Sequence, residues 1–174
     1  MPDGRNILID NRDNIAAWCI VFYNRQVIGG ARVCRRDSQG LFEVQAYKTG
    51  QSFDELMREQ RHPNMVELTR GVVDPTFVRF GIFRMMLKTM FEYCSKYKLS
   101  ALTAPSNKSV INTYNKIEFP DSKRQFKFEP QDPEPAQLFI AYHELGQIDK
   151  IFESLKKLVE ERQSRLILPL APKT

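Results

Sequence analysis

The chain has 174 residues, of which 42% are hydrophobic and 27% charged, a composition typical of one folded domain rather than a disordered chain. No apolar run approaches the roughly 20 residues of a membrane-spanning helix, and the first residues lack the basic and apolar regions of a signal peptide. The three cysteines form no C-x-x-C pair and the two histidines lie far apart, which favours reduced thiols in a cytoplasmic protein and no metal site.

The formal net charge of +5 is compatible with several kinds of negatively charged partner. The basic residues are scattered and do not alternate with aromatic ones, so the pattern does not favour nucleic acid. Coenzyme phosphates or an acidic acyl carrier protein would suit this charge equally well. An ordinary basic surface is the alternative.

The first half of the chain predicts a hairpin, a further strand and a helix. Two apolar runs are separated by the short turn Asn24–Arg25, as in a β-hairpin. A third strand and a helix with apolar residues at helical spacing are expected after them. The expected ranges are Ala17–Tyr23, Gln26–Cys34, Leu41–Ala46 and Ser52–Arg61.

The second half alternates strands and helices. Met65–Val73 predicts a central strand, and apolar residues recur at helical spacing over Phe77–Tyr97. Further strands are expected over Leu99–Thr103 and Ala136–Tyr142, and further helices over Lys108–Ile117 and Ile148–Gln163. The Pro-rich stretch Glu129–Pro135 predicts a loop, and Arg165–Thr174 a tail with a strand-like start.

This order predicts a single domain over residues 1–174 of the α/β (α+β) class. We expect a mixed central sheet flanked by helices, with a core over about residues 15–145 and a C-terminal helix and tail over residues 146–174.

The junction between the central strand and the helix after it is the first candidate site. Helix N-termini bind phosphate through backbone N–H groups and a partial positive charge. Gly81 would let the backbone approach a pyrophosphate closely, and Arg79 and Arg84 add charge. A plain strand-to-helix turn is the alternative.

The second candidate site is the segment from Asn107 to Phe119. With Tyr114 and Lys116 in register, it resembles the coenzyme-A-binding pattern Asn-x-x-Ala-x-x-x-Tyr-x-Lys-x-Gly-Phe of the GCN5-related N-acetyltransferases (GNAT). Glu118 stands where that pattern has glycine.

The pyrophosphate-loop pattern of the same superfamily, Gln/Arg-x-x-Gly-x-Gly/Ala, maps onto Val78–Phe83. Gly81 matches its central glycine, and the two end residues depart from it.

The GNAT resemblance implies the mixed-sheet fold and an acyl-thioester co-substrate, either acyl-CoA (including acetyl-CoA) or an acyl carrier protein. It implies that backbone N–H groups of Val72 and Val73 polarise the thioester carbonyl. Tyr114 would protonate the leaving thiolate, and its alternative role is packing a helix on the sheet. The implied cofactor-binding residues are Val72, Val73, Arg79, Gly81, Ile82, Arg84 and Asn107.

A narrower resemblance concerns the central strand. Glu67-Leu68-Thr69-Arg70 is similar to the Glu-x-Ser-Arg strand of the acyl-homoserine-lactone (autoinducer) synthases, which share the GNAT superfold. Those enzymes carry an Asp-x-x-Asp pair before the hairpin, at the spacing of Asp10 and Asp13, and an arginine at the position of Arg32.

This second resemblance implies that Glu67 is the base or orients a water, and that Asp10, Asp13, Arg32 and Arg70 bind or organise the acceptor. Arg70 lies three residues from Glu67, so the two side chains should lie on opposite faces unless a bulge intervenes. The alternatives are surface salt bridges and, for the aspartates, a turn or helix cap.

Two features bear on the acyl chain and the cleft. Five apolar residues could line an acyl tunnel or belong to the core: Phe22, Phe42, Phe80, Phe83 and Met86. Only nine residues precede Asp10, whereas the autoinducer synthases have a helical segment there. We therefore expect the C-terminal helix Ile148–Gln163 to cover the cleft instead, the cleft to be open, or the chain to be a truncated relative.

Three hypotheses follow. The first is an autoinducer-synthase-like acyltransferase that moves an acyl group from a coenzyme A or acyl-carrier-protein thioester to a small amine. The second is an ordinary acetyl-CoA-dependent N-acetyltransferase. The third is a catalytically degenerate binding module of the same fold. The sequence indicates no oligomeric state.

Overall fold

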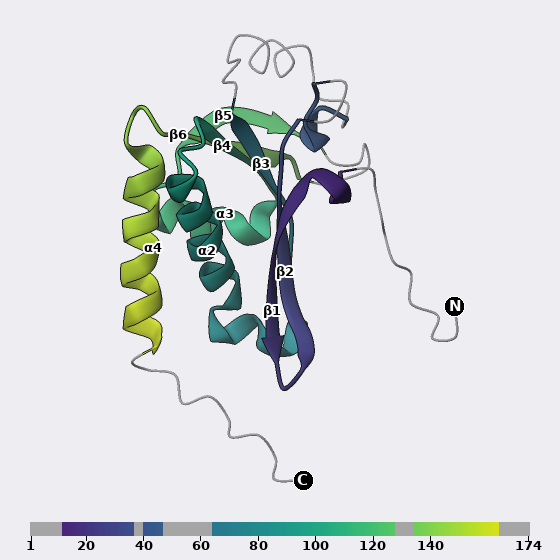
Figure 1. Cartoon of the computed structure of the whole chain (residues 1–174), viewed down its shortest axis with the longest axis vertical. Helices are drawn as coiled ribbons and strands as arrows, with labels where there is room; N and C mark the ends of the chain where they lie inside the picture. Colours follow the sequence, from purple (N-terminus) through teal and green to yellow (C-terminus); the bar gives the residue numbers. More distant parts are fainter. Residues whose placement is uncertain (1–11, 37–39, 47–63, 128–133, 164–174) are drawn as a thin grey trace, which may run out of the picture.

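The computed structural model describes residues 12–36, 40–46, 64–127 and 134–163. Figure 1 shows a mixed sheet with its helices gathered to one side, where α2 and α4 run next to each other. The strands are β1 (Ala16–Tyr23), β2 (Gln26–Cys34), β3 (Met65–Val73), β4 (Ala101–Ser106), β5 (Asp121–Phe126) and β6 (Ala136–Tyr142). The helices are α2 (Ile82–Lys96), α3 (Lys108–Lys116) and α4 (Gln147–Gln163), with 3₁₀ turns η1 (Asp13–Ile15), η2 (Glu43–Ala46) and η3 (Pro75–Phe80).

The six strands in the described part of the chain form one sheet in the order β1-β2-β3-β4-β6-β5. β3 and β4 pair in parallel, whereas the other neighbours pair antiparallel. The parallel pair requires a crossover, which η3 and α2 provide. The expected mixed sheet flanked by helices is therefore confirmed.

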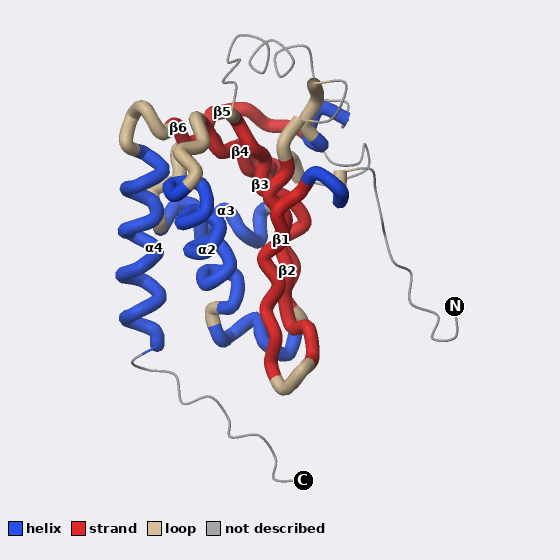
Figure 2. Tube along the Cα trace, in the orientation of Figure 1, coloured by secondary structure: helices blue, strands red, loops and turns tan. Residues whose placement is uncertain are grey.

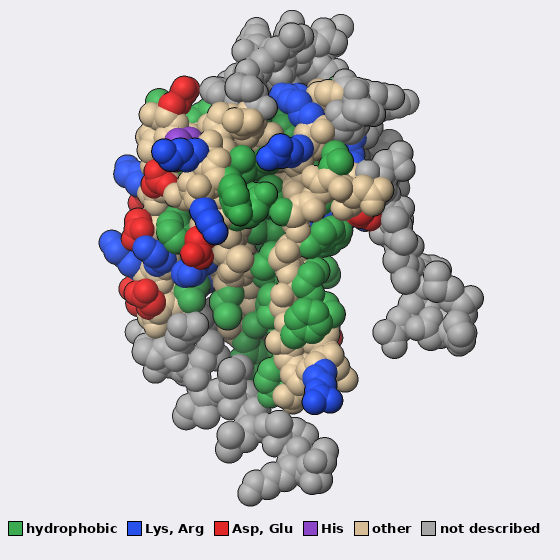
Figure 3. Space-filling model, viewed as in Figure 1, with side chains coloured by type: hydrophobic (Ala, Val, Ile, Leu, Met, Phe, Trp, Pro, Cys, Tyr) green, Lys and Arg blue, Asp and Glu red, His purple; other side chains and the backbone are tan. Residues whose placement is uncertain are grey.

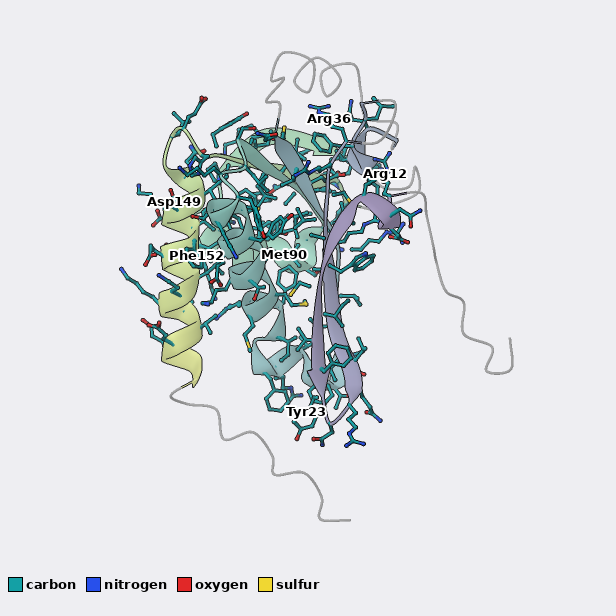
Figure 4. The ribbon with its side chains drawn as sticks, in the orientation of Figure 1. Arg12, Tyr23, Arg36, Met90, Asp149 and Phe152 are labelled. Carbon is teal, nitrogen blue, oxygen red and sulfur yellow. The ribbon has the colours of Figure 1, made fainter. Side chains whose placement is uncertain are left out.

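The β1–β2 hairpin has the predicted turn. Asn24 and Arg25 have φ values of 47° and 64°, as a two-residue turn matched to the twist of the strands requires. Figure 2 shows the hairpin running lengthwise beside the helices. Tyr23, labelled at its tip in Figure 4, packs on Phe77 of η3 with ring centroids 5.4 Å apart.

The two faces of the sheet carry different cores. On the helix face, Met86 and Phe91 of α2 pack with Ile117, Phe139 and the α4 residue Ile151. On the opposite face a smaller cluster joins the segment around η2 to β3, β4 and β6; it includes Phe42, Val44, Met65, Leu138 and Ile140. Neighbouring β6 residues point to opposite faces, as strand geometry requires.

The hairpin also has an apolar surface. Trp18, Ile20, Phe22 and Val27 are exposed to solvent. Figure 3 shows hydrophobic side chains running down this part of the molecule. Among the described helices, none is long and apolar enough to cross a membrane.

One predicted element is wrong. Leu41–Ala46 is not a strand, because the chain curls into η2 at Glu43. Its alternating burial, with Phe42 and Val44 buried, imitates a strand. The backbone N–H groups of Glu43 and Val44 bond to the Glu67 carboxylate, which replaces the hydrogen bonds of a strand ladder.

Two further differences concern boundaries and an omission. The helix expected over Phe77–Tyr97 is interrupted at Gly81, whose left-handed φ of 76° separates η3 from α2. The strand β5 was not predicted, because its sequence Asp-Ser-Lys-Arg-Gln-Phe is polar and it lies at a sheet edge. The expected helix Ser52–Arg61, the tail Arg165–Thr174 and most of the loop Glu129–Pro135 lie outside the described residues.

Candidate active site

The candidate site begins where β3 and β4 separate. The two strands pair at Met65–Ala101, Val66–Leu102 and Glu67–Thr103, and no pair is formed beyond these among the described residues. A cavity of about 190 Å³ opens after the last pair, walled by the end of β3 on one side and by β4 and α3 on the other. Its lining residues include Thr69, Arg70, Gly71, Phe83, Ser106, Asn107, Ser109, Val110 and Tyr114.

A β-bulge shapes the β3 side of this cavity. Arg32 pairs with Thr69 and Gly30 with Val72, so β3 has one extra residue in this interval. Arg70 takes a left-handed φ of 53° there. Because of the bulge, Glu67 and Arg70 are not on opposite faces of the sheet: both side chains reach Glu43 on the same face.

Close packing requires a glycine at position 71, next to the bulge. A Cβ at this position would lie 2.9 Å from Cε2 of Phe83, so a side chain would displace the ring. Because Phe83 and Gly71 both line the cavity, the glycine also sets its width.

A second cavity of about 360 Å³ lies at the N-terminus of α2. Gly81, Arg84 and Val73 contribute to its wall. It shares four lining residues with the first cavity, namely Gly71, Phe83, Ser109 and Val110, so the two form one continuous groove along the helix face.

The other residues predicted to bind the cofactor are placed differently. Ile82 is buried in the core, and the Val72 side chain is exposed. Arg79 is exposed in η3, and neither Arg79 nor Val72 lines either cavity. Asn107 lines the first cavity and caps α3, where its Oδ1 accepts a hydrogen bond from the Ser109 N–H.

Tyr114 lies at the inner end of the groove. It is 3% exposed, and its ring packs against Phe83, Phe119 and Phe139. Burial raises the pKa of the Tyr114 hydroxyl to about 12, although the adjacent Ser106 hydroxyl lowers it in part.

A charged cluster occupies the opposite face of the sheet. Arg32 is fully buried and bonds to three side chains: Asp13 at 2.5 Å, Thr69 at 3.2 Å, and Glu43. Arg70 in turn lies 3.5 Å from the second carboxylate oxygen of Glu43. Glu43 therefore joins Arg32, which has no exposed surface, to Arg70, which lines the cavity.

Glu67 is fully buried behind this cluster. Its two carboxylate oxygens accept hydrogen bonds from the backbone N–H groups of Glu43 at 2.7 Å and Val44 at 2.9 Å. Burial raises the pKa of Glu67 to about 7, although the two backbone hydrogen bonds act in the other direction.

The structure thus brings together Asp13, Arg32, Glu67 and Arg70 from distant parts of the sequence. Asp10 lies outside the described residues. Glu43 was missed, because a single acid between Phe42 and Val44 has no motif of its own. Among the described residues, no group of three His, Cys, Asp or Glu side chains is arranged to hold a metal ion.

Similar folds occur among solved acyltransferase structures. MesI, a CoA-dependent acyl-homoserine lactone synthase, superposes with a TM-score of 0.65 at 13% identity, over 90% of this chain and 75% of MesI. FeeM, an N-acyl amino acid synthase from uncultured soil microbes, gives 0.58 at 15% identity, over 88% of this chain and 72% of FeeM. An N-acetyltransferase from Staphylococcus aureus Mu50 gives 0.52 at 16% identity, over 75% of this chain and 69% of that one.

No curated protein matches the chain in sequence. At these identities the solved structures show a shared fold. The family itself is shown by sequence, because residues 2–88, half of the chain, match the model of the acetyltransferase (GNAT) domain. The chain belongs to the GNAT acyltransferase family.

Proposed function

We propose that the protein transfers an acyl group from a coenzyme A or acyl-carrier-protein thioester to a small amine, in the manner of the acyl-homoserine-lactone and N-acyl amino acid synthases. The observation that carries this proposal is the opening between β3 and β4. A groove on the helix face and a charged cluster on the other face meet there, at Arg70 and Thr69. A donor can therefore enter from one face and an acceptor from the other.

The donor side begins at the N-terminus of α2. The first N–H groups of a helix have no partner within it and attract phosphate. Gly81 keeps the backbone accessible, and the Arg84 side chain lines the same cavity. The coenzyme arm would then follow the groove past Phe83 and Val110 to the opening between the strands.

The thioester carbonyl would lie against the edge of β3. The pairing of β3 with β4 ends at Glu67, so N–H groups beyond it that point toward β4 face the groove. Those in the segment through Val72 and Val73 would polarise the carbonyl, as the sequence resemblance implies.

On the acceptor side, Arg70 is the proposed contact with the amine substrate. It lines the cavity, and Glu43 holds its guanidinium. Arg32 and Asp13 would act indirectly, since Arg32 has no exposed surface and is bonded to three neighbours.

The role of Glu67 as general base stays a prediction. Its contacts favour a positioning role, because both oxygens hold backbone N–H groups of the η2 segment and it lines neither cavity. By fixing η2, Glu67 would place the Glu43 carboxylate between Arg32 and Arg70.

Ligand-induced thermal stabilisation tests the donor site. We expect coenzyme A, acetyl-CoA or a long-chain acyl-CoA at about 100 times its Kd to stabilise the fold by about 2.7 kcal/mol, which raises the Tm by several degrees. Arg84→Ala should reduce the shift more than Arg79→Ala, because only Arg84 lines the groove.

Thiol release in the presence of candidate amines tests the reaction itself. The proposal would be wrong if no coenzyme A ligand shifts the Tm and no thiol is released from either acyl-CoA or acyl carrier protein. Binding without release for any amine would instead favour a binding module.

A reaction with acetyl-CoA is the second candidate, favoured by the small opening. The cavity between the strands has about 190 Å³, and Tyr114 with its aromatic neighbours fills the space behind it. Of the five residues considered for an acyl tunnel, Phe83 lines both of the cavities described above and the other four line neither. A kcat/KM that falls from acetyl-CoA to octanoyl-CoA would favour this candidate, and a rise would favour the long-chain reaction.

A further inference from the structure

Ser106, the last residue of β4, has a buried hydroxyl that makes no hydrogen bond. The residue is 1% exposed, and its Oγ has no partner among the described residues. Leaving such a group unsatisfied costs folding free energy, so native proteins rarely keep one without a reason. The side chain lines the cavity where β3 and β4 separate.

Two other hydroxyls near Ser106 already donate hydrogen bonds. Thr103, on the same strand, donates to the backbone oxygen of Phe139 at 3.2 Å. Ser109, at the start of α3, donates to Oδ1 of Asn107 at 2.5 Å. The Ser106 hydroxyl approaches that of Tyr114 closely enough to affect its pKa, but hydrogen-bond geometry is not met.

The backbone holds this hydroxyl in a fixed place. Ser106 pairs with Gln137 of β6, and Asn107, the next residue, caps α3. A hydroxyl anchored between a strand and a helix needs little reorganisation to meet a ligand, which is the property that makes a donor effective in catalysis.

We propose that Ser106 is a further catalytic residue, whose hydroxyl donates a hydrogen bond to the thioester sulfur and stabilises it as the carbon–sulfur bond breaks. The inference rests on the proposed function and names a residue that performs it. Sulfur is the expected partner because the coenzyme arm would end at this cavity, beside Tyr114 and across from Arg70.

The proposed step exchanges the carbon–sulfur bond of the thioester for a carbon–nitrogen bond. The amine nitrogen bonds to the thioester carbon, the carbon–sulfur bond breaks, and its electron pair leaves on sulfur. The nitrogen loses one proton and the sulfur finally gains one, so the products are an amide and a thiol.

Tyr114 and Ser106 would share the task at sulfur. Because burial raises the pKa of Tyr114 to about 12, full transfer of its proton to a thiolate, whose conjugate acid has a pKa of about 8.5, is uphill. Two hydrogen bonds to the thiolate would stabilise it without that transfer, and the proton can reach the sulfur after the bond has broken.

The test measures the thiol pKa of bound coenzyme A. Thiolate absorbance is titrated in the complex, with the titration of the protein alone subtracted. In the wild type the pKa of the bound thiol should lie below that of free coenzyme A, and Ser106→Ala should raise it by about one to two units. With acyl-CoA, the same variant should lower kcat about 10- to 100-fold.

Two variants and one further readout separate this role from a structural one. Ser106→Thr keeps a hydroxyl and should restore most of kcat. Thr89→Ala removes an exposed hydroxyl that donates to the Met85 backbone oxygen and lines neither cavity, so it should leave the thiol pKa unchanged. Ligand-free Ser106→Ala should unfold at the same temperature as the wild type or higher, because it removes an unsatisfied buried group.

The outcomes are distinguishable. An unchanged thiol pKa and kcat in Ser106→Ala would overturn the role of Ser106 while leaving the proposed function intact. So would a fall of several degrees in its ligand-free Tm, which would make Ser106 structural. If the wild type binds neither coenzyme A nor acyl-CoA, the donor site itself is wrong and the role of Ser106 fails with it.

Discussion

Two features of the Glu67 environment shift the pKa of its carboxyl in opposite directions. Glu67 is fully buried, which favours the neutral acid, whereas the hydrogen bonds from the N–H groups of Glu43 and Val44 favour the carboxylate. Burial has the larger effect, and the pKa rises to about 7. A carboxyl with this pKa can act as a base, or it can hold the two backbone N–H groups with a strength that depends on pH. Kinetics and unfolding of a Glu67 variant distinguish these roles.

We expect Glu67→Gln to lower turnover far more than it weakens thioester binding. The side chain lies on the η2 face and lines neither cavity, so the affinity for acyl-CoA should change less than about twofold. Turnover should fall because an amide offers only one oxygen to two N–H donors, which loosens η2 and the carboxylate of Glu43. Steady-state kinetics with separate Kd measurements checks this. Equal losses in kcat and affinity would reassign Glu67 to the general stability of the fold.

The same variant gives a pH test. Because the pKa of Glu67 is about 7 in the folded state and 4.5 in its reference state, the folded protein holds this proton more tightly. That contribution to stability is complete below pH 4.5 and is lost as the pH rises to about 7. The free energy of unfolding of the wild type, relative to Glu67→Gln, should therefore fall by roughly 3 kcal/mol over this range. Denaturant unfolding at several pH values measures it, and a constant difference would contradict the raised pKa.

The residues of the site differ in how far they could be predicted. Arg32, Glu67 and Arg70 belong to a strand-and-hairpin pattern that resembles a known family. Glu43 could not be found in this way, because its role comes from the two arginines that meet its carboxylate, and these come from β2 and β3. Ser106 shows no signal either, since a missing hydrogen bond exists only in three dimensions.

The backbone at the end of α3 bears on a departure from the GNAT pattern. Glu118 stands where the pattern has glycine, and its φ of 55° is the left-handed conformation that glycine adopts without strain. A glycine at this position would adopt the same backbone conformation without a Cβ clash.

This geometry gives a stability prediction. Glu118→Gly should raise the free energy of unfolding by about 0.5–1 kcal/mol, because the relief of left-handed strain exceeds the entropy that glycine adds to the unfolded chain. Glu153→Gly, the same replacement within α4, should lower it by a similar amount. Thermal unfolding of both variants checks the pair; a loss of stability in both would show that Glu118 is not strained.

Helices and strands with a clear local sequence pattern were predictable, whereas those that depend on contacts with distant residues were not. β3 and β6 were predicted at their observed bounds because their apolar runs and breakers are local. η2 has the burial pattern of a strand, but the Glu67 carboxylate takes its N–H groups. The interruption at Gly81 could have been expected from the glycine, since few other residues adopt its φ.

In the molecule as a whole, the sheet separates the proposed donor side from the proposed acceptor side. The helix face holds the groove and the η2 face holds the charged cluster, and the two meet where β3 and β4 part, at Thr69 and Arg70. Sequence order predicted the mixed sheet, but the place where it opens depends on where the pairing ends and on the bulge.

Gly71 lies where these parts meet, so it tests the continuity of the groove. Alanine there would place a methyl group 2.9 Å from Cε2 of Phe83 and push the ring into a wall that both cavities share. We expect Gly71→Ala to weaken coenzyme A binding by about tenfold or more and to lower stability by about 1–3 kcal/mol, as overpacking does. Calorimetric titration and thermal unfolding measure the two effects.

Gly30→Ala is the matched control. Its added Cβ would lie 3.4 Å from Cδ1 of Ile20, an ordinary contact on the same sheet, and it would touch neither cavity. Coenzyme A affinity should stay near that of the wild type in this variant. If Gly71→Ala binds coenzyme A as Gly30→Ala does, the donor does not pass Phe83. The groove would then end at the α2 N-terminus, and the thioester would have to reach the charged cluster by another route.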